Sequence, residues 1–475
     1  MKNYDYIILG TGPAGYKLAQ LLAKTGKSLL AVEGGLFGGT CPNVGCEPKI
    51  FLSGAVHTAL ASQQLVGRGI AQPAQVDWNQ LMTVKKARFD SWPAETKAIY
   101  EKMCDVAVGY GEFVDAHTIQ VNGHQYHGTH IIIATGHRPH RLDIPGKEYL
   151  HDSTDVLSLS HRPGHAVFIG GGYVAIELAT FLAAAGTKVD LLIRSDRILR
   201  GFYGKYAQEM VDQLTARGLT FHFQTTASAV AKTGERVTVT TNHGEQLTTD
   251  YVVDASGRVP NIEKLQLAAA GIKYSRRGID VDDHLQTSVA GVYAIGDITS
   301  QPVPKLTTVA ELEADYLYRQ LVKGDQEPLR YPTIGTAAFA FPEIAQAGVN
   351  PEEAADDSRY QVVEHDLSFG SFYAGLNEQG AKLTVVYDRD QRLVGASEIG
   401  ATAADDINNL VPVIGLQPSS REWQRKVLPA YPALADKVFG LLKQREWDRS
   451  FQLRLIILKV AKRLARKLCF SPASC

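Results

Sequence analysis

The sequence has few cysteines, almost no net charge and no long hydrophobic run. Five cysteines in 475 residues are too few for the disulfide framework of a secreted protein. The formal net charge of -1 gives no general attraction to nucleic acid, and no window reaches the ~18 apolar residues of a membrane-spanning helix. Because no signal-like segment precedes the first strand-like run, we expect a cytoplasmic protein. The balanced charge predicts that it does not bind nucleic acid.

The length excludes a single hydrophobic core. At 475 residues the chain is expected to form about three domains. Hydrophobic residues make up 45% and charged residues 21%, which is typical of a globular protein and unlike a disordered chain. Only the C-terminal tail departs from this balance.

Residues 4–33 contain the pattern of a dinucleotide-binding βαβ unit. An apolar strand leads into the turn Gly10-x-Gly12-x-x-Gly15, and an amphipathic helix, a second strand and Glu33 follow. The glycines allow a tight turn and a close approach of pyrophosphate to the helix N-terminus, while an acid ~20 residues further on can accept from a ribose 2'-OH. The alternative is a glycine turn that only packs a helix against a sheet.

The same pattern recurs at 165–194, with a fingerprint made of Gly170, Gly172 and Ala175. Here the second strand ends at Arg194 instead of an acid, and Arg200 follows. Two guanidinium groups suit bidentate recognition of a 2'-phosphate, which favours NADPH over NADH. The alternative is that both are solvated surface arginines. Two dinucleotide sites with different ribose readers indicate two different dinucleotides, and therefore electron transfer between them.

Motifs from residue 4 to about 440 resemble, in order, those of the FAD-dependent pyridine nucleotide-disulfide oxidoreductases, the family of glutathione reductase, lipoamide dehydrogenase and mercuric reductase. The motifs are GTGPAG, GGTCPNVGCEPK, IIIATG (131–136), GGGYVAIE, DASGRVPN (254–261), GVYAIGD (291–297), LTTVA (306–310) and FPEIAQAG (341–348). The resemblance implies an α/β fold with two Rossmann-like dinucleotide-binding domains and a C-terminal α+β dimerisation domain. It also implies FAD and NADPH as cofactors, and a homodimer that reduces a small-molecule acceptor.

The resemblance further implies domain boundaries. A discontinuous FAD-binding domain would combine 1–148 with 266–330, around an NADPH-binding domain at 149–265. A dimerisation domain would cover 331–442, and a basic amphipathic tail would occupy 443–475.

Roles for single residues follow from the same resemblance. The residues expected along the FAD are Glu33 at its ribose, Asp297 at its ribityl chain, Thr40 and Thr135. Lys49 and Glu177 match the pair beside the flavin N5, and Tyr173 matches the residue that gates the nicotinamide pocket in glutathione reductases. Further cofactor contacts are implied at Gly136, Gly257, Thr307 and Ala310.

Cys41 and Cys46 lie five residues apart in the segment CPNVGC. Positions i and i+5 of an ideal helix diverge by ~140°, too far for a disulfide, so the segment must be distorted, and Gly45 assists. A helix start and the nearby Lys49 would favour a thiolate. Zinc would require four soft ligands, but the nearest other cysteine is Cys104 and the motif has no histidine, so no metal site is expected. The pattern therefore favours a redox pair over a structural staple.

The resemblance assigns Cys46 as the thiolate next to the flavin and Cys41 as the thiol that attacks the substrate. Electrons would then pass from NADPH through FAD to the cysteine pair and on to a disulfide, as in glutathione reductase. Gln20, however, stands where glutathione reductases have an arginine that helps to hold the tripeptide.

The expected C-terminal base is also changed. Disulfide-reducing members carry a His-Glu dyad, but the matching stretch here is AYPALAD (430–436), with Tyr431 and Asp436 at the two positions and no histidine after His365. A tyrosine with a pKa near 10 is a poor base at pH 7. The change fits a slower disulfide reductase, a quinone or metal-ion reductase, or a flavin-bearing redox sensor without turnover.

The tail is basic and amphipathic. Between 449 and 468 it has no acid and seven basic residues, which are Arg449, Arg454, Lys459, Lys462, Arg463, Arg466 and Lys467. Such a helix is typical of peripheral contact with the inner face of a membrane, and the alternative is a helix that docks on its own dimer. Cys469 and Cys475 follow, either as an electron relay or as incidental residues.

Overall fold

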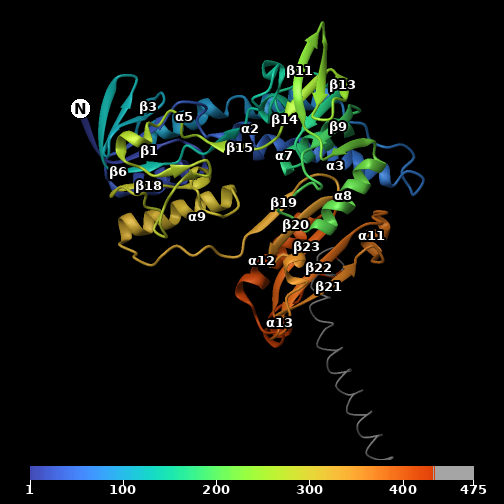
Figure 1. Cartoon of the computed structure of the whole chain (residues 1–475). Helices are drawn as coiled ribbons and strands as arrows, with labels where there is room; N and C mark the ends of the chain where they lie inside the picture. The colour runs from blue at the N-terminus through green and yellow to red at the C-terminus, as the bar shows by residue number, and fades with distance from the viewer. Residues whose placement is uncertain (432, 434–475) are drawn as a thin grey trace, which may run out of the picture. The chain divides into compact units, whose positions relative to one another are not determined.

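The computed structural model describes residues 1–431 and 433 (Figure 1). Asp436, the basic segment 449–468 and the two C-terminal cysteines lie outside the described residues. The chain divides into two compact units. The first contains Met1–Pro332 and Ala338–Phe341, and the second contains Thr333–Ala337 and the chain from Pro342 onward.

The larger sheet of the first unit has seven strands, in the order β3-β2-β1-β6-β5-β4 with β18 also paired to β6. Five of them run parallel, and β4 and β5 are antiparallel to their neighbours. The strands are β1 (Lys2–Leu9), β2 (Leu29–Glu33), β3 (Asp105–Val108), β4 (Glu112–Asp115), β5 (Thr118–Val121), β6 (His124–Ile133) and β18 (Val292–Ala294). Because β18 pairs with β6, the sheet joins two segments that lie far apart in the sequence.

The continuous apolar run of β1 is explained by burial on both faces of this sheet. Side chains alternate along a strand, so Ile8 faces one side and Ile7 the other. Ile8 packs with Leu18 of helix α1 (Pro13–Leu22) and Ala314 of helix α9 (Thr307–Tyr318). The two helices therefore cover the same face, and they pack against each other.

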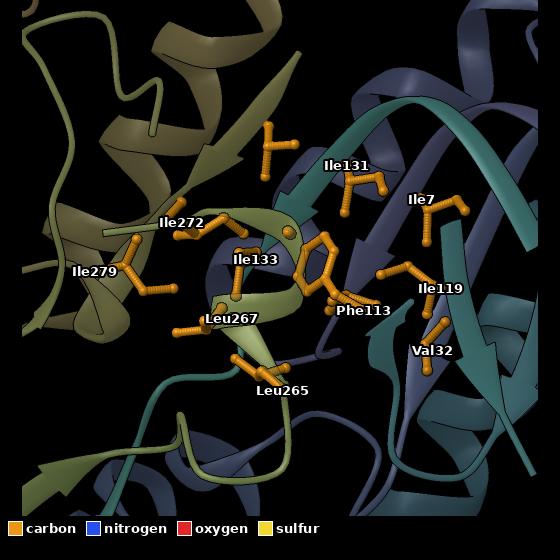
Figure 2. Close-up of a cluster of buried hydrophobic side chains, with 14 of the residues drawn as sticks. Ile7, Val32, Phe113, Ile119, Ile131, Ile133, Leu265, Leu267, Ile272 and Ile279 are labelled. Carbon is orange, nitrogen blue, oxygen red and sulfur yellow. The ribbon is translucent and has the colours of Figure 1, made fainter. Parts of the chain in front are cut away.

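Figure 2 shows the cluster on the opposite face, where Ile7 packs. Its labelled members are Ile7, Val32, Phe113, Ile119, Ile131, Ile133, Leu265, Leu267, Ile272 and Ile279. Each fully buried side chain of this kind stabilises the fold by about 1.5–3 kcal/mol relative to exposure. Four of the labelled residues come from the chain between 265 and 279, so this core fastens the later segment to the N-terminal strands.

The second parallel sheet of the first unit has the order β10-β9-β8-β14. Its strands are β8 (His165–Ile169), β9 (Lys188–Ile193), β10 (Leu219–Phe223) and β14 (Tyr251–Asp254), connected in part by α7 (Tyr173–Ala184) and α8 (Gly204–Ala216). An antiparallel sheet of β11 (Ala227–Thr233), β12 (Arg236–Thr241) and β13 (Gln246–Thr249) precedes β14. Two parallel sheets with connecting helices confirm the predicted α/β class.

Shorter elements complete the first unit. The helices are α2 (Thr40–Val44), α3 (Cys46–Gln64), α4 (Trp78–Phe89), α5 (Trp92–Met103), α6 (Ser153–Val156), the 3-10 helices η1 (Ala23–Thr25), η2 (Lys147–Tyr149), η3 (Leu267–Ala270) and η4 (Gly296–Ile298), and the π-helix η5 (Arg319–Lys323). The two-stranded pairs are β7 (His137–Pro139) with β15 (Arg258–Pro260), and β16 (Tyr274–Ser275) with β17 (Gly278–Ile279).

The second unit contains a five-stranded sheet in the order β19-β20-β23-β22-β21. Its strands are β19 (Gly335–Ala338), β20 (Glu343–Gly348), β21 (Tyr360–Asp366), β22 (Lys382–Asp388) and β23 (Leu393–Gly400), and its helices are α10 (Pro351–Ala354), α11 (Ser371–Gly375), α12 (Ala403–Leu416) and α13 (Ser420–Lys426). Helix α12 packs against β20 and β23. The domain boundaries given above stay a prediction. Within the described part of the chain, no helix combines the length and the apolar character needed to cross a membrane.

Candidate active site

Four of the residues predicted to line the FAD lie at the carboxyl ends of parallel strands. Gly10 follows β1, Glu33 ends β2, Thr135 comes two residues after β6, and Asp297 lies in the turn after β18. Because these strands are parallel neighbours in one sheet, their carboxyl ends meet at the same edge. The structure therefore brings these predicted residues to one side of the sheet.

The turn after β1 requires glycine at its first position. Gly10 has a φ of 104°, and a Cβ there would lie 2.4 Å from the carbonyl oxygen of Ala134. The next residue, Thr11, donates to Glu33 Oε2 from its backbone N–H at 2.9 Å and from its hydroxyl at 2.6 Å. Gly35 N–H donates to the other carboxylate oxygen at 2.7 Å. These bonds orient the Glu33 carboxylate, and its remaining lone pairs can accept from a ribose hydroxyl.

The two predicted phosphate-binding turns both end in a helix without a side-chain cap. Helix α1 begins after Gly12 and helix α7 after Gly172, and neither cap residue has a side-chain hydrogen bond. The first N–H groups of a helix need an acceptor, and together with the helix dipole they favour an anion. The donors present therefore fit the pyrophosphates of FAD and of a pyridine nucleotide. Gly15 and Ala175 lie within the first turn of their helices and are buried.

Asp297 lies among charged groups in a buried setting. Burial raises the pKa of its carboxyl group, while the charges of Arg258 and Lys305 oppose that rise. The preceding N–H, that of Gly296, donates to Glu313 Oε2 at 2.5 Å. Ala310 of α9 faces the same turn, because a Cβ on Gly296 would lie 3.6 Å from the Ala310 Cβ. The turn is thus held against α9.

The predicted positions Thr135 and Gly136 are fixed by one asparagine. Asn261 Nδ2 donates to the Thr135 carbonyl oxygen at 2.7 Å, and the Thr135 hydroxyl donates to the Asn261 carbonyl oxygen at 3.1 Å. The Asn261 N–H donates to the Gly136 carbonyl oxygen at 2.9 Å. Gly257 accepts from the N–H of His140 at 3.0 Å. These bonds join the segment after β6 to the segment that contains Gly257.

The cysteine pair lies at a break between two helices. Helix α2 begins at Thr40, and helix α3 begins at Cys46. A Cβ on the intervening Gly45 would lie 2.8 Å from the Thr40 carbonyl oxygen and 3.2 Å from the Cys41 Cα, so a larger residue would force the two turns apart. The prediction that the segment is distorted at Gly45 is therefore confirmed.

Both cysteines are free thiols in the structure, with Cys41 half-buried and Cys46 exposed. The Thr307 hydroxyl, at the start of α9, lies 3.3 Å from Cys41 Sγ and 3.9 Å from Cys46 Sγ. The hydrogen bond from Cys41 lowers the pKa of Cys46 to about 6, and Thr307 and the Lys49 charge act in the same direction. The same bond raises the pKa of Cys41. These shifts favour Cys46 over Cys41 as the thiolate of the pair.

Lys49 and Glu177 form an ion pair with 3.2 Å between Nζ and Oε1. Glu177, on α7, is 1% exposed, and its burial raises the pKa of the carboxyl group while Lys49 lowers it. The N–H of Phe339 donates to Glu177 Oε1 at 2.7 Å. Tyr173 starts the same helix one turn earlier and is 43% exposed. The sequence patterns did not predict a role for Phe339. It lies two residues before the motif FPEIAQAG (341–348) and belongs to no motif itself.

The second fingerprint lies beside the predicted phosphate readers. Arg194 directly follows β9, and both it and Arg200 are exposed. The N–H of Leu199 donates to the Gly171 carbonyl oxygen at 2.8 Å, so the segment that carries Arg200 is bonded to the glycine turn. The two arginines thus lie at the carboxyl edge of the second sheet, where Gly170 follows β8.

The last predicted catalytic residues are Tyr431 and Asp436, the C-terminal pair. Tyr431 is 84% exposed in the second unit, and its predicted partner Asp436 is outside the described residues. Among the residues that the structure describes, no group of three or more His, Cys, Asp or Glu side chains is arranged to hold a metal ion.

The fold and this site define an oxidoreductase with two dinucleotide sites and a redox-active cysteine pair. The sequence profile of the pyridine nucleotide-disulphide oxidoreductase family matches residues 4–314, and the chain belongs to this family. Membership implies FAD and a pyridine nucleotide as cofactors.

Individual relatives cover most of the chain. It is 33% identical over 422 residues to the dihydrolipoyl dehydrogenase of Geobacillus stearothermophilus, covering 86% of this chain and 88% of that protein. It is 28% identical over 461 residues to a glutathione reductase of Burkholderia cepacia, covering 94% and 100%. The chloroplastic/mitochondrial glutathione reductase of Pisum sativum is 32% identical over 371 residues, which span 74% of this chain and 66% of the pea protein.

A solved structure shares the architecture. The Cu(II) complex of the HOCl-induced flavoprotein disulfide reductase RclA from Escherichia coli superposes with a TM-score of 0.84 at 25% sequence identity. The alignment covers 94% of this chain and 100% of that protein. The resemblance stated from the motifs is thus confirmed at the level of family and fold.

Proposed function

We propose that this protein is an FAD-dependent reductase that uses NADPH to reduce a small disulfide through Cys41 and Cys46. The observation that carries the proposal is the environment of Cys46. Cys46 is the first residue of a long helix, and the hydrogen bond from Cys41, followed by Thr307 and the Lys49 charge, lowers its pKa to about 6. Such an environment favours a reactive thiolate over an inert structural cysteine.

The residues expected to hold FAD are those at the carboxyl edge of the seven-stranded sheet. The Gly10 turn and the first N–H groups of α1 suit its pyrophosphate, Glu33 its ribose, and Asp297 its ribityl chain. When bound, FAD supplies a two-electron carrier between the reduced pyridine nucleotide and the cysteine pair. We expect Lys49 and Glu177 to balance each other's charge beside it, and Tyr173 to cover the nicotinamide pocket.

The chain's own chemistry is thiol–disulfide exchange. Cys41, after transferring its proton to the Cys46 thiolate, attacks one sulfur of the substrate disulfide. That S–S bond breaks, a bond between Cys41 and the attacked sulfur forms, and the other substrate sulfur leaves as a thiolate. Cys46 releases its proton to solvent and, again as a thiolate, attacks Cys41 Sγ, and the second substrate sulfur also leaves as a thiolate. Two electrons pass from the dithiol to the substrate, and the pair ends as the Cys41–Cys46 disulfide.

The choice of NADPH rests on Arg194 and Arg200. Both are exposed at the edge where the adenosine ribose of a bound dinucleotide would lie, and neither position carries the acid that would favour a free 2'-OH. Guanidinium groups bind phosphate in a bidentate manner. We therefore expect a clear preference for NADPH over NADH.

The physiological disulfide is expected to release a thiol of low pKa. Tyr431 stands where the family has its proton-transfer histidine, and tyrosine is a poor base at neutral pH. A leaving thiol with a pKa below about 7 departs as a thiolate and needs no proton donor. We further propose a homodimer, as in the family. We also propose a cytoplasmic location, and the alternative is a protein held at the inner face of the membrane through 449–468.

A metal-ion reductase is the second candidate. The structural neighbour from Escherichia coli is a Cu(II) complex of a flavoprotein disulfide reductase. In this chain Cys46 is exposed and its thiolate is favoured, and soft thiolates donate readily to copper. One-electron transfer to a metal ion also needs no base, so Tyr431 would be no handicap.

An NADPH-oxidation assay with the purified flavoprotein separates these functions. The acceptors are glutathione disulfide, a disulfide of a low-pKa aromatic thiol, Cu(II) and a water-soluble quinone, each under anaerobic conditions. Turnover with the aromatic disulfide that disappears in Cys41→Ser supports the proposal. Turnover with Cu(II) or the quinone alone supports a metal-ion or quinone reductase. Failure of NADPH to produce the long-wavelength absorbance of a thiolate beside flavin in the wild type would rule out the cysteine-based mechanism.

A further inference from the structure

Phe339 contacts both members of the Lys49–Glu177 pair. Its backbone N–H donates to Glu177 Oε1 at 2.7 Å, the same oxygen that lies 3.2 Å from Lys49 Nζ. Its ring lies under the Lys49 ammonium, with 4.2 Å between Nζ and the ring centroid, which is a cation–π distance. One residue therefore holds the anion with its peptide group and the cation with its side chain.

The carbonyl group of the same residue is held by a histidine. His57 Nε2 lies 3.3 Å from the Phe339 carbonyl oxygen. A carbonyl oxygen only accepts, so this nitrogen carries the hydrogen. Burial lowers the pKa of His57, and the Lys49 charge lowers it further, so the imidazole is neutral at pH 7. His57 acts in this contact as a neutral donor.

The packing around His57 restricts its ring. The ring centroid is 5.5 Å from that of Phe341 and 6.4 Å from that of Phe181. Phe181 is on α7 one turn beyond Glu177, and His57 is on α3 about two turns beyond Lys49. Helix α3 thus carries both Lys49 and His57, and helix α7 carries both Glu177 and Phe181.

We infer that His57 is a positioning residue for the Lys49–Glu177 pair, acting through the peptide group and ring of Phe339. The inference deepens the proposed function, because it concerns the residues that would lie beside the reacting groups of that reaction. It does not make His57 a catalytic residue, since His57 contacts neither cysteine in any interaction described above.

The geometry explains why such a support would matter. Glu177 is 1% exposed, so its charge depends on the few groups that replace water. Lys49 and the Phe339 N–H are those groups, and both favour the ionised carboxylate. If the Phe339 peptide rotates away, Glu177 keeps only Lys49 and takes up a proton more readily. Because the Glu177 charge raises the pKa of Cys46 and the Lys49 charge lowers it, the thiolate responds to the state of this pair.

The test compares two substitutions of the holoenzyme. His57→Leu removes the donor, while His57→Gln keeps an N–H donor on a flexible side chain. His124→Leu, at an exposed histidine on β6, is the control for the loss of a histidine. The readouts are kcat and KM for the disulfide, the pH midpoint of the thiolate absorbance in the NADPH-reduced enzyme, and the carboxyl ionisation of Glu177 by infrared difference spectroscopy, assigned with Glu177→Gln.

For His57→Leu we expect kcat to fall about tenfold, which corresponds to the loss of one hydrogen bond to a charged group, here the bond from the Phe339 N–H to Glu177. The KM for the disulfide should stay within about twofold of wild type. The Glu177 ionisation should move to higher pH and the thiolate midpoint to lower pH, each by about half a unit or more. His57→Gln should restore most of both shifts, and His124→Leu should match wild type.

Equal Glu177 ionisation in His57→Leu and wild type would overturn the inference, as would a His57→Gln enzyme as impaired as His57→Leu. Should His57→Leu fail to retain FAD, His57→Met carries the same comparison. The infrared readout does not depend on turnover. A wild type without thiolate absorbance, in which His57→Leu still shifts the Glu177 ionisation, would therefore disprove the proposed function and leave the positioning role intact.

Discussion

Thr307 Oγ1 lies 3.3 Å from Cys41 Sγ, although 266 positions separate the two residues. The same oxygen is 3.9 Å from Cys46 Sγ. The hydroxyl donates to Cys41 Sγ, and its contact with Cys46 Sγ is the longer of the two. Both contacts lower the pKa of the thiol concerned, so the start of α9 favours ionisation of the pair, alongside the positive end of α3.

Thr307→Val should raise the pKa of Cys46 by up to about one unit, because valine keeps the shape of threonine but removes the donor. The change is measured as the pH midpoint of iodoacetamide alkylation of the NADPH-reduced enzyme. Thr308→Val is the matched control, since Thr308 is the exposed neighbour on the same helix. An unchanged midpoint in Thr307→Val would show that its hydroxyl does not stabilise the thiolate.

The two substitutions Cys41→Ser and Cys41→Ala should separate the hydrogen bond from the sulfur. The bond from Cys41 is the largest cause of the low Cys46 pKa, and a serine hydroxyl can still donate. Cys41→Ser should therefore keep a midpoint near about 6. Cys41→Ala should move it upward towards ~8.5. In both variants thiolate absorbance is lost as the pH falls through the midpoint, and identical midpoints would contradict the assignment.

Replacing Arg194 and Arg200 together by alanine should reduce the preference for NADPH. Each arginine's lost hydrogen bond to the 2'-phosphate is worth about 1.5–3 kcal/mol, so losing both should lower kcat/KM for NADPH roughly 10²- to 10⁴-fold. The value for NADH should change little, because NADH has no phosphate there. Arg276→Ala, at an exposed position after β16, serves as the control. A parallel loss with both nucleotides would mean that the arginines do not read the ribose.

Stability of the second unit should fall as the pH rises, because of a buried acid. Glu398 on β23 is fully buried, and burial, followed by the nearby Asp406, raises the pKa of its carboxyl group well above the ordinary value. A group with a raised folded-state pKa contributes its full stability below its unfolded pKa, about 4.3, and loses it as the pH rises through the folded value. The free energy of unfolding falls by about 1.4 kcal/mol for each pH unit between the unfolded and the folded pKa, and it is constant above the folded pKa.

Glu398→Gln cannot ionise, so its thermal midpoint should fall less than that of wild type between pH 6 and about 9. Differential scanning calorimetry across this range measures the difference. Glu353→Gln, at an exposed position on α10, controls for the loss of a carboxyl group. If the wild type and Glu398→Gln show parallel pH curves, Glu398 does not hold its proton in the folded state.

The sequence predicted well those features that depend on neighbours along the chain. The turn at Gly10 and the strand that ends at Glu33 follow from a pattern within 30 residues, because a βαβ unit is built from consecutive elements. The break at Gly45 followed from helix geometry alone, since two cysteines five apart cannot meet on a regular helix. Both predictions needed only local backbone rules, and those rules do not depend on the rest of the fold.

What only the tertiary structure decided is how distant side chains meet around the cysteines. Thr307 reaches both sulfurs because β18 and the turn after it direct α9 to the same sheet edge. Phe339 reaches Glu177 because Ala338–Phe341 belongs to the first unit, far along the chain from α7. Hydrogen bonds between residues far apart in sequence depend on the packing of whole elements, which no local pattern encodes. The sequence by itself therefore determined the family, the two dinucleotide turns and the cysteine pair, whereas the tertiary structure decided which distant residues surround the two sulfurs and the Lys49–Glu177 pair.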